Sequence, residues 1–226
     1  ADLPSALRAD AVPRGVRLLA CDVRDESQVA SLVDAAEADG GPVTCVIANA
    51  GVPGGGGLDA PNQSWELAWQ VNVMAHVYLA RAIVPRMLAR GGGQFASVAS
   101  AAGLLTNLGN APYSVTKHGA AAFAEWLAIE HGDEGLDVRL IAPMGIETPM
   151  LQSGDDTVSG QSIRALGVID PGQAATMIVD GLAGDDFLIL THPEVATIES
   201  ARVGDRDQWL RGMRKAQAAV QSQLRD

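Results

Sequence analysis

The sequence predicts a three-layer α/β fold in which helices cover both faces of a doubly wound, mostly parallel sheet. Short apolar runs alternate with helical patterns along the chain, which is typical of strand–helix–strand units. The runs are apolar without alternation, as expected for strands that are covered on both faces. Hydrophobic residues make up 47% of the 226 residues and charged residues 19%, so we expect residues 1–226 to form one domain.

The first half of the chain is expected to hold three strands and two helices. The strands are the apolar runs at 16–23 (VRLLACDV), 43–50 (VTCVIANA) and 94–100 (QFASVAS). A helix is predicted over 28–38, where the apolar residues follow the i, i+3, i+4, i+7 spacing of one helix face. A second helical pattern covers 64–90, and we expect Pro85 to bend or end it.

The second half continues the alternation. A helical pattern at 113–131 is closed by Gly132, and a strand follows at 137–143 (DVRLIAP). Asp170 as N-cap and Pro171 at the first helical position predict a helix over 171–182. The remaining predicted elements are a strand at 187–190 (FLIL) and an amphipathic helix at 205–224.

Charge and composition exclude several classes of partner. The net charge is −11 and no run of Lys or Arg is present, so nucleic acids and anionic membrane surfaces are not expected partners. No apolar stretch reaches the ~18–20 residues of a membrane span, and no secretory signal pattern is visible. Cys21 and Cys45 are expected to be small buried hydrophobes. These observations favour a cytoplasmic protein.

The residues that follow the predicted strands are the first candidates for a binding site, because open α/β sheets bind ligands beyond the carboxyl ends of their strands. They are Asp22 after the first strand, Asn49, Ala50 and Gly51 after the second, Ser100 after the third, and Pro143 to Thr148 after the fourth. The histidines form no cluster with the spacing of metal ligands, so no metal is expected; they are His76, His118, His131 and His192.

Tyr113 and Lys117 lie four residues apart at the start of a predicted helix, so both side chains share one helix face. Tyrosine has an ordinary pKa of ~10, and a lysine ammonium one turn away is expected to lower that pKa by favouring the phenolate. The pair is then suited to general acid/base catalysis. By itself this spacing also fits an exposed helix pair, and the surrounding motifs decide between the two.

Six segments carry a resemblance to a known family. In chain order they are CDV (21–23), NAG (49–51), VNV (71–73), SVASAAG (97–103), YSVTK (113–117) and PMGIET (143–148). Together they resemble the short-chain dehydrogenases/reductases of the non-extended type, over about residues 16–195. The resemblance implies a Rossmann-like sheet and an NAD(P)-dependent oxidoreductase that interconverts an alcohol and a ketone or aldehyde by hydride transfer.

The resemblance implies four catalytic residues. Tyr113 would donate a proton to a carbonyl oxygen in reduction or accept one in oxidation, and Lys117 would lower its pKa and bind the nicotinamide ribose. Ser100, 13 residues before Tyr113, would hydrogen-bond the substrate oxygen; Ser97 is the competing serine, in the middle of a strand. Asn72 resembles the asparagine that completes a proton relay.

The same resemblance implies cofactor contacts to NAD or NADP. Asp22 and Val23 would flank the adenine, and Asn49, Ala50 and Gly51 would line the cofactor together with Tyr113 and Lys117. Pro143, Ile146 and Thr148 would lie at the nicotinamide, with Thr148 on its carboxamide. Met144 departs from the glycine that the family commonly has there. Residues 150–168 resemble the mobile lid over the substrate, with Met150, Leu151 and Ile163 as candidate pocket residues.

The opening strand, the Thr-Gly-x-x-x-Gly-x-Gly turn, the helix and the second strand of the family are missing before residue 16. Two relaxed glycine patterns, at 55–60 and 91–96, fail as replacements because the first leads into Pro61 and the second precedes a strand. The first explanation is that the sequence is a piece of a longer protein. The second is a natural variant that has lost cofactor binding or is completed by a partner.

Two hypotheses on function therefore stand beside each other. The first is the oxidoreductase, acting on a small alcohol or carbonyl compound, because all four catalytic residues are present. The second is a non-catalytic homologue that acts as a subunit or binding protein, because the phosphate-binding turn is missing. The family also implies a homo-oligomer, a dimer or tetramer, built from the helices at 64–90 and 113–131; burial within the subunit explains their tryptophans equally well.

Overall fold

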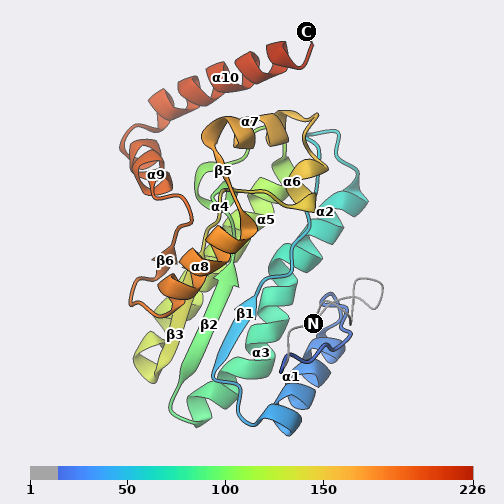
Figure 1. The fold of residues 1–226 in the computed structure, drawn as a ribbon, viewed down its shortest axis with the longest axis vertical. Coiled ribbons are helices and arrows are strands. Elements are labelled where there is room, and N and C mark those ends of the chain that lie inside the picture. Colours follow the sequence, from blue (N-terminus) through green and yellow to red (C-terminus); the bar gives the residue numbers. More distant parts are fainter. Residues whose placement is uncertain (1–14, 226) are drawn as a thin grey trace.

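The structure is a computed structural model that describes residues 15–225 (Figure 1). Its main sheet has four parallel strands in the order β1-β2-β3-β6. The strands are β1 Cys45–Ala48, β2 Gly93–Val98, β3 Leu136–Ile141 and β6 Leu188–Ile189. The parallel pairing places the carboxyl ends of these strands at one edge of the sheet, as the alternation of strands and helices predicts.

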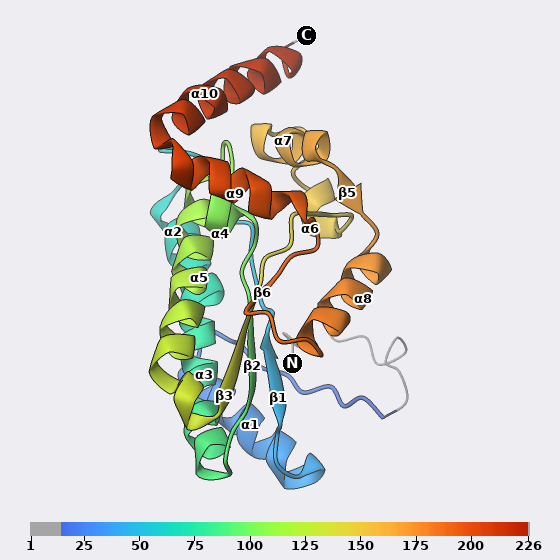
Figure 2. The ribbon, with the colours of Figure 1, turned by 90° about the vertical axis from the view of Figure 1, so that its left-hand side faces the viewer.

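One face of the sheet is covered by three helices, α1 (Glu26–Gly40), α3 (Ala75–Ala89) and α5 (Ala111–His131), which lie together on one side in Figure 2. The main core lies between these helices and the strands. Phe95 of β2 is fully buried there with Ile83 and Met87 of α3. Each such side chain contributes about 1.5–3 kcal/mol through burial, so this face fixes the docking of α3 and α5.

The opposite face is covered by α8 (Pro171–Leu182), which lies alone beside the strands in Figure 2. Ala96, Ile141 and Ile189 form a small second core with side chains of α8. The three-layer prediction is confirmed. The second core contains residues of β2, β3 and β6 but none of β1, and Ile47 of β1 is 46% exposed. Cys45 is exposed although we expected both cysteines to be buried; Cys21 is buried.

Residues 16–23 do not form the strand that their apolar run predicts. They make no ladder with the sheet and contain only an isolated bridge residue, Ala20, while Val16 and Leu18 are exposed. A strand is stable only when a neighbour pairs with its backbone N–H and C=O groups. In the family's sheet, two strands lie in space between the strand formed by this run and β1. Both precede this run in the chain, and residues 15–225 contain neither of them.

The long helix predicted over 64–90 is interrupted by a π-helical turn. It consists of α2 (Asn62–Trp69), the π-turn Gln70–Met74 and α3. Pro85 lies inside α3 and does not end it, because α3 continues to Ala89 with Ile83, Val84 and Met87 buried against the core. The π-turn is the feature with functional consequences, since such turns frequently occur at functional sites.

The other predicted helices are confirmed with small changes. Helix α1 covers 28–38, and α8 has the predicted bounds, with the Asp170 carboxylate accepting hydrogen bonds from the Gly172 and Gln173 N–H groups. Helix α5 begins at Ala111, where Asn110 is its N-cap, and α10 (Arg206–Gln223) matches the amphipathic tail.

Several short elements were not predicted. They are α4 (Ala102–Leu105), η3 (Gly132–Glu134), β4 (Gly145–Ile146), α6 (Pro149–Gln152), α7 (Val158–Leu166), β5 (Val168–Ile169) and α9 (Glu194–Gly204). Elements β4 and β5 pair in parallel and bracket the expected lid, whose α7 is held by ion pairs from Arg164 to Glu147 and Asp155. None of the helices in residues 15–225 has the length and apolar character needed to cross a membrane.

Candidate active site

The carboxyl edge of the sheet brings together residues from three different strands. Asn49 to Gly51 follow β1, Ser100 follows β2 and Pro143 follows β3. The last two segments are held together by backbone hydrogen bonds from Ala99 N to Ile141 O (2.8 Å) and from Ala101 N to Pro143 O (2.7 Å). This edge is the place where open α/β sheets bind their ligands.

Asn72 is brought into the interior by the π-turn and is completely buried. Its side-chain oxygen accepts from Val52 N (2.8 Å), and its Nδ2 donates to Val52 O (3.0 Å) and to Thr116 Oγ1 (3.0 Å). Asn72 therefore joins the loop after β1 to helix α5. In this arrangement its side-chain amide is engaged with protein groups, so a part in a proton relay played by that amide would require one of these bonds to be exchanged.

Lys117 reaches from α5 to the end of β2. It is 3% exposed, and its Nζ donates to the carbonyl oxygen of Val98 (2.9 Å). The same Nζ lies 5.7 Å from the centre of the Tyr113 ring. A Cβ added at Gly51 would lie 3.5 Å from Lys117 Nζ and 3.6 Å from Asn72 Oδ1. The structure thus gathers Gly51, Asn72, Tyr113 and Lys117 at one point, and the missing side chain of Gly51 leaves room there.

The electrostatics of the pair differ from the expectation based on spacing. Burial raises the pKa of Tyr113 above its ordinary value, and the Ser100 hydroxyl beside it offsets this only in part. Burial also lowers the pKa of Lys117 to about 8. The pKa of Tyr113 is therefore raised, where the spacing predicts that Lys117 lowers it. Desolvation of the phenol is the main cause, and the Lys117 ammonium, which is directed to Val98 O, is not among the groups that shift this pKa.

Ser100 and Ser97 have different surroundings. The Ser100 hydroxyl accepts from Ala102 N (3.1 Å), donates to Pro143 O (3.3 Å) and lies beside Tyr113. Ser97 is completely buried in the middle of β2, where its Oγ is 2.8 Å from His76 Nδ1. Burial and the nearby Lys117 cation lower the pKa of His76 to about 3, so this histidine is neutral at physiological pH. Of the two serines, only Ser100 adjoins the Tyr113 hydroxyl.

Asp22 and Val23 lie in the loop before α1. The Asp22 carboxylate is held by the Arg24 guanidinium, whose Nε lies 2.8 Å from Oδ1, and this bond lowers the pKa of Asp22 to about 2. Glu26, at the start of α1, forms an ion pair with Arg81 of α3. The contacts of Asp22 are thus local, to Arg24 and to Gln28 of α1, whose side-chain oxygen accepts from Asp22 N (2.9 Å).

The segment after β3 is used mainly for local structure. Thr148 caps α6 by accepting from Leu151 N (3.4 Å), and Ile146 pairs with Ile169 in the two-stranded sheet. Met144, at the position of the family's glycine, packs against the main core. Of the candidate pocket residues, Leu151 is buried and Met150 is 40% exposed. Ile163 lies against Gly145, where an added Cβ would be 3.1 Å from its Cγ2.

Sequence reasoning missed two residues that hold the site together, Asn110 and Thr116. Asn110 is the N-cap of α5 and donates to Pro53 O (2.9 Å), while Thr116 meets Asn72. An asparagine directly before a helical pattern, with a proline in the first turn, is a signal for a helix start, so the cap could have been predicted from the sequence. The bond from Asn110 to Pro53 could not, because the two residues are distant in sequence.

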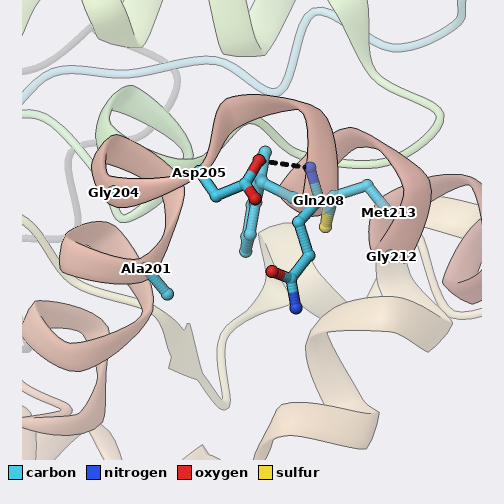
Figure 3. A pocket seen from close by; sticks show the side chains of 7 residues that line it. Ala201, Gly204, Asp205, Gln208, Gly212 and Met213 are labelled. Carbon is cyan, nitrogen blue, oxygen red and sulfur yellow. Dashed lines mark hydrogen bonds between the residues drawn. The ribbon is translucent and has the colours of Figure 1, made fainter.

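A cavity of about 520 Å³ lies between α9 and α10 and is shown in Figure 3. Trp209 and Met213 form an apolar wall of this cavity. Asp205 also lines it, but its carboxylate is the N-cap of α10 and accepts from Gln208 N (2.8 Å). None of the predicted catalytic residues lines it. Within residues 15–225 no three His, Cys, Asp or Glu side chains gather in a way that could hold a metal ion.

The chain belongs to the short chain dehydrogenase family, because the sequence model of that family matches residues 3–159, more than half of the chain. An uncharacterised NAD-dependent oxidoreductase of Mycobacterium tuberculosis is 37% identical over 154 residues, covering 67% of this chain and 56% of that protein. A 1-deoxy-11-beta-hydroxypentalenate dehydrogenase of Streptomyces exfoliatus is 29% identical over 215 residues, covering 89% of this chain and 72% of that protein.

Solved structures agree with this assignment. A short chain dehydrogenase/reductase from Burkholderia phymatum, crystallised with NAD, superposes with a TM-score of 0.74 at 27% identity, covering 84% of this chain and 75% of that one. The doubly wound, Rossmann-like α/β fold is therefore confirmed. The chain spans about half the length of the curated relatives it matches first, 56% of one and 52% of another.

Proposed function

We propose that this chain carries the proton-transfer half of the active site of an NAD(P)-dependent oxidoreductase that interconverts an alcohol and a ketone or aldehyde. The observation that carries the proposal is the convergence of Ser100, Tyr113 and Lys117 with Asn72 at the carboxyl edge of the sheet. Lys117 is almost wholly buried there, and none of residues 15–225 supplies a carboxylate partner, so its charged form is unfavourable by comparison with an exposed lysine. Such cost is typical of functional sites.

The residues present fit the nicotinamide end of a dinucleotide. Gly51 leaves open the space next to Lys117 Nζ, whose ammonium has three donors and uses one on Val98 O, so others remain for ribose hydroxyls. Asn49, Ala50, Pro143, Ile146 and Thr148 would line the same end. Asp22 and Val23 are assigned to the adenine end; there the Asp22 carboxylate would have to leave Arg24 or share it. Relatives named as NAD-dependent or crystallised with NAD support the choice of cofactor.

The dinucleotide supplies the hydride when bound, and the chain supplies the proton and the orientation. Tyr113 Oη would donate its proton to the carbonyl oxygen in reduction and accept it in oxidation. A raised pKa keeps that phenol protonated at neutral pH, which suits the donor role in reduction. Ser100 Oγ would hydrogen-bond the same substrate oxygen, and the Lys117 ammonium would bind the nicotinamide ribose rather than shift the pKa of the phenol.

A non-catalytic homologue is the second candidate, and one observation favours it. The Asn72 amide is bonded to Val52 and Thr116, and Lys117 Nζ is directed to Val98 O, so both side chains already have structural partners within the protein. A homologue that retained Asn72 and Lys117 only for structural reasons would show the same hydrogen bonds. Binding and turnover measurements separate the two candidates.

The substrate is proposed to be a small molecule, and the assembly a homo-oligomer in the cytoplasm. The oligomer rests on an apolar stripe on the outer surface of α5, formed by Val115, Trp126 and Ile129, which are 50%, 50% and 82% exposed. Helix α2 adds Trp69 beside α5, 44% exposed and within 3.9 Å of a Cβ added at Gly119. We call these four residues the α2–α5 surface.

The test is Tyr113→Phe in the natural protein, measured as oxidation of NADH or NADPH with a panel of ketones and aldehydes. Loss of the phenol should lower kcat by about 10²-fold to 10⁴-fold, because a positioned proton donor contributes that much. Tyr78→Phe is the matched control, since Tyr78 is the other of the two tyrosines and lies on α3. Unchanged turnover in Tyr113→Phe would contradict the assignment. Failure of the wild type to bind NADH and NADPH would favour the non-catalytic candidate.

A further inference from the structure

The loop that follows β1 lies across the first turn of α5. Val52 is held at one end by the Asn72 side chain, through Val52 N to Oδ1 (2.8 Å) and Nδ2 to Val52 O (3.0 Å). At the other end Ala111 N, in the first turn of α5, donates to Gly56 O (3.0 Å). The loop between these points is therefore fastened to the helix that carries Tyr113 and Lys117.

Asn110 makes the connection in the middle of this loop. Its side-chain oxygen accepts from Tyr113 N (3.3 Å), and its Nδ2 donates to Pro53 O (2.9 Å). Asn110 is 8% exposed, and its backbone oxygen accepts from the Ser114 hydroxyl (2.8 Å). A helix cap needs only the acceptor, which serine or aspartate would supply equally well. The asparagine carboxamide also has an N–H donor, Nδ2, and in this structure Nδ2 bonds the Pro53 carbonyl of the loop.

The loop would not hold this position by its own stiffness. Gly54, Gly55 and Gly56 all have positive φ, at 73°, 75° and 82°. Glycine adopts positive φ about as readily as negative φ, so the backbone of these residues has no strong preference for the observed conformation. At Gly54 the loop touches the catalytic helix itself: an added Cβ would lie 3.0 Å from Pro112 Cβ and 3.3 Å from Tyr113 N. Of the three glycines only Gly54 thus contacts the first turn of α5, and the bonds of Pro53 and Gly56 on either side hold it there.

We infer that Asn110 is a positioning residue, which clamps the glycine loop 52–56 onto the first turn of α5 and so fixes where Tyr113 stands relative to Ser100 and the substrate. The inference rests on the proposed function. It assigns Asn110 a task beyond capping, and it makes the loop a support for the Tyr113 backbone. A displacement of about 1 Å at a reacting group costs as much as 10²-fold in rate, so a support of this kind matters to turnover.

The first variant is Asn110→Ser, which keeps an acceptor for Tyr113 N and cannot also reach Pro53. We expect kcat to fall about tenfold to a hundredfold with little change in the KM for the cofactor, because chemistry and not binding is disturbed. The melting temperature should stay within about 2 °C of the wild type, since serine and asparagine are equivalent caps. If kcat and KM both match the wild type, Asn110 is only a cap and the inference fails.

The second variant approaches the contact from the other side. Gly54→Ala should lift the loop from Pro112 and Tyr113 while Asn110 is left intact. Gly55→Ala is its matched control, because Gly55 has nearly the same φ but an added Cβ there meets nothing within 4 Å. Both carry the same backbone strain, so the difference between them reports the contact alone. We expect the Gly54→Ala variant to lose at least about tenfold more in kcat; equal losses would overturn the inference.

A third readout does not depend on turnover. The chain has two tyrosines, so the absorbance of tyrosinate near 295 nm, corrected with Tyr113→Phe, gives the titration of Tyr113 alone. In Asn110→Ser the midpoint should change, because the pKa of Tyr113 depends on its burial and on the Ser100 hydroxyl beside it, and a displaced first turn of α5 alters both. Backbone hydrogen exchange at Gly55 and Ala111 should become faster. An unchanged midpoint with unchanged exchange contradicts the inference even if the wild type proves inactive, whereas inactivity alone contradicts only the proposed function.

Discussion

Lys117 is the residue whose charge state reports most directly on the site. It is buried with its Nζ on a backbone carbonyl, and burial lowers its pKa from 10.5 to about 8. The unfolded chain keeps this proton up to about pH 10.5, whereas the folded protein releases it near pH 8. Between these values the unfolded state binds more protons, so the contribution of Lys117 to the free energy of unfolding rises with pH.

This gives a prediction at the residue scale. From pH 7 to pH 9 the free energy of unfolding of the wild type should gain about 1 kcal/mol from Lys117, and a Lys117→Met variant should lack this gain. Urea unfolding of both proteins at several pH values measures the difference, and all other titrating groups are common to the two. Parallel pH dependences would show that Lys117 has an ordinary pKa in the folded protein.

At the scale of the element, the position of Tyr113 and Lys117 depends on how α4 packs on α5. Gly103 of α4 lies so close to α5 that an added Cβ would be 2.5 Å from the carbonyl oxygen of Lys117. That oxygen belongs to the helix backbone and cannot move without shifting the catalytic turn. The motif SVASAAG thus ends in a residue whose missing side chain lets the two helices meet.

Gly103→Ala is accordingly predicted to lower the free energy of unfolding by about 1–3 kcal/mol and to reduce turnover as well. Gly212→Ala in α10 is the control, since an added Cβ there meets nothing within 4 Å and alanine should stabilise the helix by up to about 1 kcal/mol. Chemical denaturation measures both variants. A neutral result for Gly103→Ala would mean that α4 moves away freely and does not fix α5.

The π-turn at Gln70–Met74 has a similar role for the other side of the site. The extra residue in this turn directs Asn72 towards Val52 and Thr116 and leaves it completely buried. An uninterrupted α-helix over 64–90, as predicted from the sequence, would point the Asn72 side chain in another direction around the helix axis. The element that departs from the regular pattern is therefore the one that places a site residue.

For the whole molecule, the α2–α5 surface is the feature that bears on assembly. Trp126 stacks on Phe123 with ring centres 6.2 Å apart, so this surface is ordered while its outer residues remain exposed. Large exposed apolar patches mark interaction sites. The prediction from sequence that these helices form an oligomer remains a proposal that this exposure supports.

The corresponding experiment changes two residues of the stripe, Trp126→Glu and Ile129→Glu together. The wild type should have a mass above that of one chain in light scattering at micromolar concentration, and the double variant should weaken the association at least about 100-fold. Val203→Glu is the control, because Val203 on α9 is 68% exposed but lies outside this surface. A wild type that scatters as one chain would exclude the proposed oligomer under those conditions.

Much of the fold could be predicted because its signals are local. The bounds of α8 follow from Asp170 and Pro171, and the apolar runs identify all four strands of the main sheet. The failures have a common origin. The run at 16–23 is as apolar as the others, but a strand also needs a neighbour, and pairing is a property of the sheet rather than of the segment.

The sequence by itself determined the fold class, the family resemblance and the identity of the candidate residues, because periodicity, caps and motif order are written in neighbouring positions. The tertiary structure alone decided what surrounds these residues: the burial that raises the pKa of Tyr113, the Val98 carbonyl that holds Lys117, and the second bond of Asn110 to Pro53. These depend on segments that meet only when the helices dock on the sheet. Desolvation and hydrogen bonding at the site arise from that docking, and a pattern of residues along the chain does not contain them.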